Sequence, residues 1–191
     1  MKTILHKTAH HMYFLALVCP PPLDEKILRF KNWMKEKFGC VVALRSPAHI
    51  TLVPPFWLTG TREEELINTL QSFSSDVGEI IVNVNGFSHF GKRVLFAAVD
   101  TSPELQLIKT EVEEHVSIVF PEIKKDERPF HPHITIANRD MKPSDFESAR
   151  LHFSTMKLDE KFVTSQISLL KHDQGRWNVI GRREWKRNSS E

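Results

Sequence analysis

The sequence has little cysteine, little net charge and no long apolar run. Its two cysteines, Cys19 and Cys40, are too few for a disulfide scaffold or a cysteine metal cluster, and they suit a reducing compartment. The net charge of +2 is too small to predict strong nonspecific binding of nucleic acid, although it does not exclude a local basic groove. No segment approaches the ~20 apolar residues that cross a bilayer. We therefore expect a cytoplasmic protein with neither a membrane nor a DNA partner.

The N-terminal segment imitates a secretory signal only in part. Lys2 and Lys7 precede the apolar run MYFLALV, but this run has only seven residues, and the following CPPPLDE is a poor cleavage site. His10 and His11 also stand just before the run. We predict a short buried strand over residues 13–19, with both histidines ahead of it.

No linker rich in glycine or serine interrupts the chain, so its elements are expected to form one rigid body. Short apolar runs bounded by turn residues predict strands over residues 13–19, 40–45, 49–53, 79–87, 94–100, 133–137, 162–170 and 176–185. Pro54 and Pro55 are predicted to end the third of these strands. Amphipathic helices are predicted to start at Asp24, at Thr61 with Glu64 as a capping box, at Ser102, and at Ser144 with Glu147 as a second capping box.

The predicted elements repeat in one order: strand, helix, His-x-Thr strand, capped helix, strand. His49 and His133 are 84 residues apart, and the helix starts Thr61 and Ser144 are 83 apart. Two matching separations indicate an internal duplication, too short to be a solenoid. The sequence predicts a single α+β domain over residues 1–191, with lobes from residues 12–90 and 94–185. Each lobe is expected to be a mostly antiparallel sheet backed by helices, and the two lobes to face a central cleft.

The two His-x-Thr strands carry the chemistry of the predicted cleft. Because side chains alternate along a strand, His49 and Thr51 point one way, as do His133 and Thr135, while the isoleucines between them point to the core. An imidazole has an ordinary pKa of ~6.5, so one ring can accept a proton while the other donates one near neutral pH. Threonine hydroxyls add donors for an anionic oxygen. This set suits a phosphodiester and needs no metal.

The two motifs resemble a known family. HITL and HITI are similar to the two His-x-Thr/Ser-x signatures of the 2H phosphoesterase superfamily. HITLVPPF and FHPHITIA resemble the first and second signatures of its branch of 2′-5′ RNA ligases and 2′,3′-cyclic phosphodiesterases. The opening strand followed by prolines and a helix also fits, as does the closing LLKHDQGRWNVI, so the resemblance covers roughly residues 12–185.

The resemblance implies a bilobal fold and metal-independent work, without a cofactor, on RNA ends or small nucleotides. The reactions implied are hydrolysis of a 2′,3′-cyclic phosphate or cleavage of a 2′-5′ linkage, with ligation as the reverse. It carries His49 and His133 over as acid and base, and Thr51 and Thr135 as phosphate binders. Which histidine is the acid stays open, as do the substrate and the oligomeric state, for which a monomer is expected.

Other side chains are weaker candidates for substrate binding. Phe56, Phe130 and Trp177 could stack a base, and Arg93 could meet a phosphate, although aromatics in a small protein more often belong to the core. The basic stretch RREWKR at residues 182–187 reads better as a solvated strand end than as a grip on RNA.

Two other functions compete with this hypothesis. One is a nucleotide- or RNA-binding module without turnover. The other is a metal-dependent hydrolase that uses His131 and His133, which share one strand face. Metal ligand sets normally have three or four members, and no carboxylate follows this pair at a matching spacing. We therefore predict no metal, and place His131 at the rim of the site.

Overall fold

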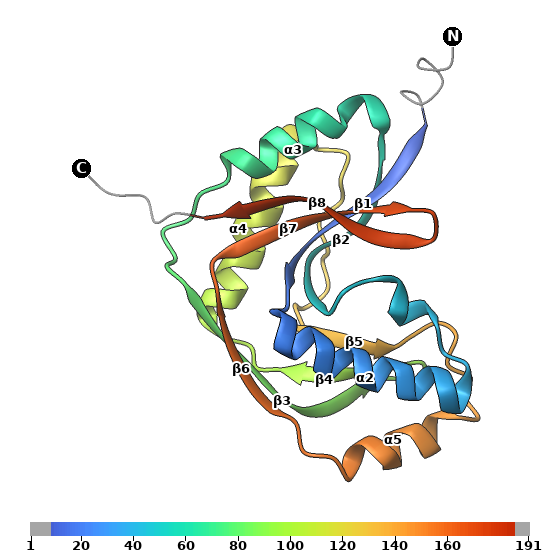
Figure 1. Ribbon diagram of the computed structural model, residues 1–191. Coiled ribbons are helices and arrows are strands. Elements are labelled where there is room, and N and C mark those ends of the chain that lie inside the picture. The colour runs from blue at the N-terminus through green and yellow to red at the C-terminus, as the bar shows by residue number, and fades with distance from the viewer. Residues whose placement is uncertain (1–8, 186–191) are drawn as a thin grey trace.

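A computed structural model describes residues 9–185, which fold as one curled sheet with helices packed on it (Figure 1). The strands are β1 (His10–Val18), β2 (His49–Thr59), β3 (Ile80–Phe90), β4 (Val94–Val99), β5 (His133–Ala137), β6 (Asp159–Thr164), β7 (Gln166–Asp173) and β8 (Arg176–Glu184). The helices are α2 (Pro21–Phe38), α3 (Glu63–Ser72), α4 (Pro103–Val119) and α5 (Phe146–Ser154), with 3₁₀ turns η1 (Val42–Arg45) and η2 (Gly60–Arg62). Within residues 9–185, no helix combines the length and apolarity needed to span a bilayer.

The sheet consists of two equal halves joined at its centre. Its strand order is β6-β3-β4-β5-β2-β1-β7-β8, and every pairing is antiparallel. The halves meet where β2 and β5 pair through Ile50 and Ile134 alone. The α+β bilobal class is thus confirmed, and the two predicted sheets are the halves of one continuous sheet.

The sheet halves do not follow the predicted lobe boundary at residues 90–94. A short turn at residues 91–93 makes β3 and β4 hairpin partners, so β3 lies in the same half as β5 although it precedes the boundary. In return, β7 pairs with β1. The helices cross over as well, because α2 packs on β5 and α5 on β3, whereas α4 packs mainly on β2 and α3 packs on β8. Each half therefore contains segments of both repeats (Figure 1).

Two predicted strands differ from the structure for local reasons. Residues 42–45 form the turn η1 and no strand, because the amides of Val41 and Val42 donate to Asp140 Oδ2 at 2.6 and 2.9 Å. The strand at 162–170 is two strands, β6 and β7, which belong to opposite halves of the sheet. His10 and His11, expected ahead of the first strand, lie within β1.

Pro54 and Pro55 do not end β2, which continues to Thr59. Beyond Ile50 this strand pairs with β1 on one side only, so a missing amide on its other side costs no ladder bond. The register between β1 and β2 also shifts twice between Phe56 and Thr51, where the prolines lie. Such irregularities accommodate a proline inside a strand.

The helix starts were predicted with mixed success. Ser102 is the N-cap of α4, and its hydroxyl accepts from the Leu105 amide as predicted. Neither capping box forms, because Thr61 lies in η2 and the Ser144 hydroxyl donates to the neighbouring Asp145 instead. Asp24 lies inside the first turn of α2, which begins after Pro20. Of the basic stretch at 182–187, residues 186 and 187 lie outside the described residues.

Candidate active site

The two His-x-Thr motifs meet at the seam between the sheet halves. Ile50 and Ile134 are both 0% exposed and pair directly, so the alternating neighbours on each strand lie on the opposite face of the sheet. In an antiparallel pair centred there, His49 stands beside Thr135, and Thr51 stands beside His133. The structure therefore brings all four predicted motif residues to one place, although 84 residues separate the histidines. All four are partly exposed.

Both histidines are oriented by the same local hydrogen bond. His49 Nδ1 lies 2.7 Å from the carbonyl oxygen of Pro47, and His133 Nδ1 lies 2.7 Å from that of His131. A carbonyl only accepts, so each Nδ1 must carry the hydrogen. The neutral rings therefore present an unprotonated Nε2, which can act as a base.

The segment before the first motif is held by helix α2. The ammonium group of Lys31, which is only 3% exposed, donates to the Ser46 carbonyl at 3.0 Å. Asp24 Oδ1 accepts from the Ala48 amide at 2.6 Å. These two hydrogen bonds hold the backbone on either side of Pro47. They therefore fix the position of the Pro47 carbonyl, which orients His49.

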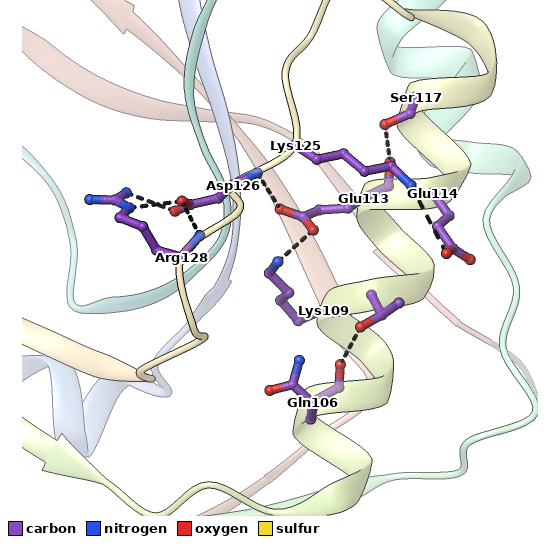
Figure 2. A network of polar contacts seen from close by, with 9 residues as sticks. Gln106, Lys109, Glu113, Glu114, Ser117, Lys125, Asp126 and Arg128 are labelled. Carbon is purple, nitrogen blue, oxygen red and sulfur yellow. Dashed lines mark hydrogen bonds and ion pairs between the residues drawn. The ribbon is translucent and has the colours of Figure 1, made fainter.

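The segment before the second motif is held at a greater distance from its histidine. A buried ion pair between Lys109 and Glu113 lies on α4, and Glu113 Oε1 accepts from the Asp126 amide at 3.4 Å (Figure 2). Arg128 pairs with the same Asp126 side chain. Asp126 precedes His131 by five residues, so this network anchors the segment without touching the carbonyl that orients His133.

The surroundings keep both histidines neutral at neutral pH. Burial lowers the pKa of His49 to about 4, and the nearby positive charge of Lys31 and of a protonated His133 adds to the effect. Burial also lowers the pKa of His133 below its ordinary value, with a further contribution from His131. The expectation of one charged ring near pH 7 thus needs correction for the free protein, because a charged imidazole loses hydration in this site.

Aromatic rings flank both histidines. The Phe14 ring on β1 lies 4.8 Å from that of His49. The rings of Phe90 and Phe96 each lie 5.0 Å from that of His133. Phe96 pairs with Thr135 across β4 and β5, so strand alternation would have placed it on the motif face had the pairing been known. The exposed His131 ring lies 5.2 Å from Phe90, at the rim as predicted.

Two of the weaker candidates lie near the motifs. Trp177 on β8 packs edge-on against Phe14 at 4.6 Å, one ring away from His49. Arg93 is exposed in the turn between β3 and β4, three residues after Phe90. Both remain candidates for contact with a substrate.

The other two candidates face the core. Phe56 packs against the buried Tyr13 at 6.1 Å, because the two register shifts together add two residues to β2 and so keep the alternation set by Ile50. Phe130 packs on the core, with the Lys109 ammonium 6.0 Å from its ring. Both side chains are only partly buried, so the stacking of a base by either stays a prediction.

A metal site has little support from the arrangement of side chains. Across residues 9–185, no three or more His, Cys, Asp or Glu side chains are placed to hold one ion. The alternative based on His131 and His133 therefore has no third protein ligand in this part of the chain.

Comparison with known sequences places the chain among phosphoesterases. The sequence model of the 2′-5′ RNA ligase superfamily matches residues 19–176. A protein of Bacillus pumilus (strain SAFR-032) that is named as a phosphoesterase is 27% identical over 162 residues, covering 82% of this chain and 89% of the relative.

Solved structures share the fold. Escherichia coli LigT in complex with 3′-AMP superposes with a TM-score of 0.66 at 16% identity, covering 93% of this chain and 99% of LigT. LigT in complex with ATP gives a TM-score of 0.63 at 15% identity over the same shares. A Thermus thermophilus protein gives 0.64 at 16% identity, covering 94% of this chain and all of that protein. At such identities the likeness shows the fold alone.

Proposed function

The chain belongs to the 2′-5′ RNA ligase superfamily, a branch of the 2H phosphoesterases, and we propose that it is a metal-independent phosphodiesterase of RNA termini or small nucleotides. The single observation that carries this proposal is the meeting of both His-x-Thr motifs around the Ile50–Ile134 pair, with the same Nδ1 hydrogen bond in each. The 3′-AMP and ATP complexes of LigT support a nucleotide as the ligand. The free, buried thiols of Cys19 and Cys40 agree with a cytoplasmic location.

The proposed reaction opens a 2′,3′-cyclic phosphate with two proton transfers. One neutral imidazole accepts a proton from water through Nε2 while the water oxygen forms a bond to phosphorus. The other imidazole, protonated at Nε2, donates its proton to the ribose oxygen whose bond to phosphorus breaks. The hydroxyls of Thr51 and Thr135 donate to the non-bridging oxygens, where negative charge gathers in the transition state. The same groups suit the cleavage of a 2′-5′ linkage. In ligation, a ribose hydroxyl attacks the phosphorus in place of water.

We assign the base to His49 and the acid to His133. With its pKa lowered to about 4, the Nε2 atom of His49 stays unprotonated over a wide pH range. His133 must be protonated when the substrate is bound. The negative charge of a bound phosphodiester favours the imidazolium form and raises its pKa toward neutrality.

The test is hydrolysis of a 2′,3′-cyclic nucleotide in EDTA across a range of pH. We expect turnover and a bell-shaped dependence of kcat/KM that peaks below pH 6.5, because kcat/KM reports the free enzyme, in which both pKa values are lowered. Activity lost in EDTA and restored by zinc would instead support the metal-dependent hydrolase. Tight nucleotide binding without turnover, across cyclic phosphates and 2′-5′ oligonucleotides, would support the binding module.

A further inference from the structure

We propose that a pocket beside His49 binds a second phosphate group of the substrate, an inference that rests on the proposed function. The pocket has a volume of about 220 Å³ and lies between helix α2, residues 44–47 and the start of β8. Arg45 and Arg176 line it from the last two of these segments, together with Trp177. None of these three side chains takes part in the proton transfers at the scissile phosphate.

The pocket adjoins the reacting imidazole through two independent contacts. Pro47 lines the pocket, and its carbonyl accepts the hydrogen bond from His49 Nδ1. Trp177 lines it as well and packs on Phe14, whose ring packs on His49. A substrate with its scissile phosphate at His49 therefore places a neighbouring nucleoside or phosphate within reach of this pocket.

The charges that line the pocket favour an anion. Arg45 and Arg176 are both exposed, and neither forms an ion pair within residues 9–185. In contrast, Arg62, Arg128 and Arg150 each pair with a carboxylate. Asp24 is the one carboxylate among the described residues that line this pocket, and it accepts from the Ala48 amide. Two guanidinium groups without carboxylate partners on facing segments suit a phosphate, whose oxygens accept paired hydrogen bonds.

This arrangement narrows the substrate class. A nucleoside 2′,3′-cyclic phosphate has no second phosphate and leaves both arginines unused. A substrate that carries a phosphate on the 5′ oxygen of the same nucleoside engages both arginines. Trp177 then offers an apolar face to the neighbouring nucleoside. The shared chemistry is a second phosphate, supplied either by an internucleotide linkage at an RNA end or by a terminal 5′-phosphate.

The kinetic test compares three substrates: a nucleoside 2′,3′-cyclic phosphate, its 5′-phosphorylated form, and a dinucleotide that ends in the same cyclic phosphate. We expect kcat/KM to be roughly 10- to 100-fold higher for at least one substrate with a second phosphate, the range for charged hydrogen bonds. The variant Arg45→Gln with Arg176→Gln should bring this ratio to within about two-fold of unity. Arg150→Gln, on the surface of α5, is the matched control and should keep the ratio. The substrate that shows the preference identifies the source of the phosphate.

A binding measurement separates failure of this inference from failure of the proposed function. Calorimetry with adenosine 3′,5′-bisphosphate and 3′-AMP needs no turnover. Tighter binding of the bisphosphate that disappears in the Arg45→Gln, Arg176→Gln variant supports the pocket, even in a protein that hydrolyses nothing. Equal binding of the two ligands, or a preference that survives in the double variant, overturns it.

Discussion

The first and second motifs have the same strand geometry but different supports. His49 is oriented by a carbonyl gripped on both sides by Lys31 and Asp24. His133 has the same Nδ1 bond, but the polar anchor of its supporting segment is at Asp126, well upstream. A duplicated strand thus provides two similarly oriented imidazoles. The segments that precede them are held differently, and this difference gives the two imidazoles different surroundings.

The difference begins in the helices that precede the motifs. Both α2 and α4 bury a lysine, but Lys31 donates to the backbone next to the motif, whereas Lys109 pairs with Glu113 on its own helix. The charge of Lys31 therefore remains close to His49 and helps to lower its pKa. The charge of Lys109 is compensated by a partner one helical turn away.

The largest expected effect comes from removing either imidazole. His49→Gln and His133→Gln should each lower kcat/KM for a cyclic nucleotide by about 10²–10⁴-fold, the usual contribution of one proton transfer. The pH profiles should then differ, because the base sets the acid limb of the bell and the acid sets the alkaline limb. His49→Gln should lose the acid limb and His133→Gln the alkaline limb. A near-normal rate in either variant would refute the role of that residue.

Removing the threonine hydroxyls should have a somewhat smaller effect. Thr51→Val and Thr135→Val keep a β-branched side chain in the strand and remove only the donor. Each should lower kcat by about 10²–10³-fold, as for the loss of one donor to a transition-state oxyanion. Steady-state kinetics with unchanged circular dichroism would confirm this. A pair of variants that bind inorganic phosphate and turn over as the wild type does would exclude both hydroxyls from the site.

The hydrogen bond from Lys31 to the segment before the first motif offers a direct test of the difference between the two motifs. Lys31→Met should lower kcat about tenfold and move the acid limb of kcat/KM to higher pH, because the loss of a nearby positive charge raises the pKa of His49. The matched control replaces the buried pair on α4 by Lys109→Met with Glu113→Leu, which leaves no unpaired charge. This control should leave the acid limb in place. A shift of the same size in both variants would mean that Lys31 acts only through stability.

The smallest expected effect is a dependence of stability on pH. The pKa of His49 is about 4 in the folded protein and near 6.5 in the unfolded chain, so between these values the unfolded chain binds more protons. The free energy of unfolding should therefore fall as the pH drops from about 6.5 toward 4, and His49 should contribute no further change above this window. Urea titrations should show a weaker fall in His49→Gln than in the wild type. Identical curves would show that the pKa of His49 is not lowered in the folded protein.

The motif face and the repeat could be predicted from the sequence because they depend on local alternation. Side chains alternate between the two faces of a strand with a period of two. Ile50 and Ile134 are therefore buried on one face, and the motif histidines and threonines lie on the other. The exchange of β3 and β7 between the halves depends on which strands pair, and alternation carries no information about pairing. For the same reason the contact of Phe96 with His133 was not foreseen.

The support of the first motif was also beyond local rules. Asp24 looked like a helix cap, but it accepts from the Ala48 amide, which lies 24 residues away in the chain. Residues 42–45 looked like a strand because residues 40–44 are apolar, but Asp140 accepts from the amides of Val41 and Val42. In both places a side chain from a distant segment accepts the hydrogen bond that determines the local backbone conformation.

The most direct test of the shared site is a crystal structure of the protein with inorganic phosphate bound. The proposed enzyme requires one phosphate ion at the seam of the sheet, within ~2.7–3.2 Å of the Nε2 atoms of His49 and His133 and of the hydroxyls of Thr51 and Thr135. An ion held by one motif while the other histidine points elsewhere would contradict a two-histidine mechanism.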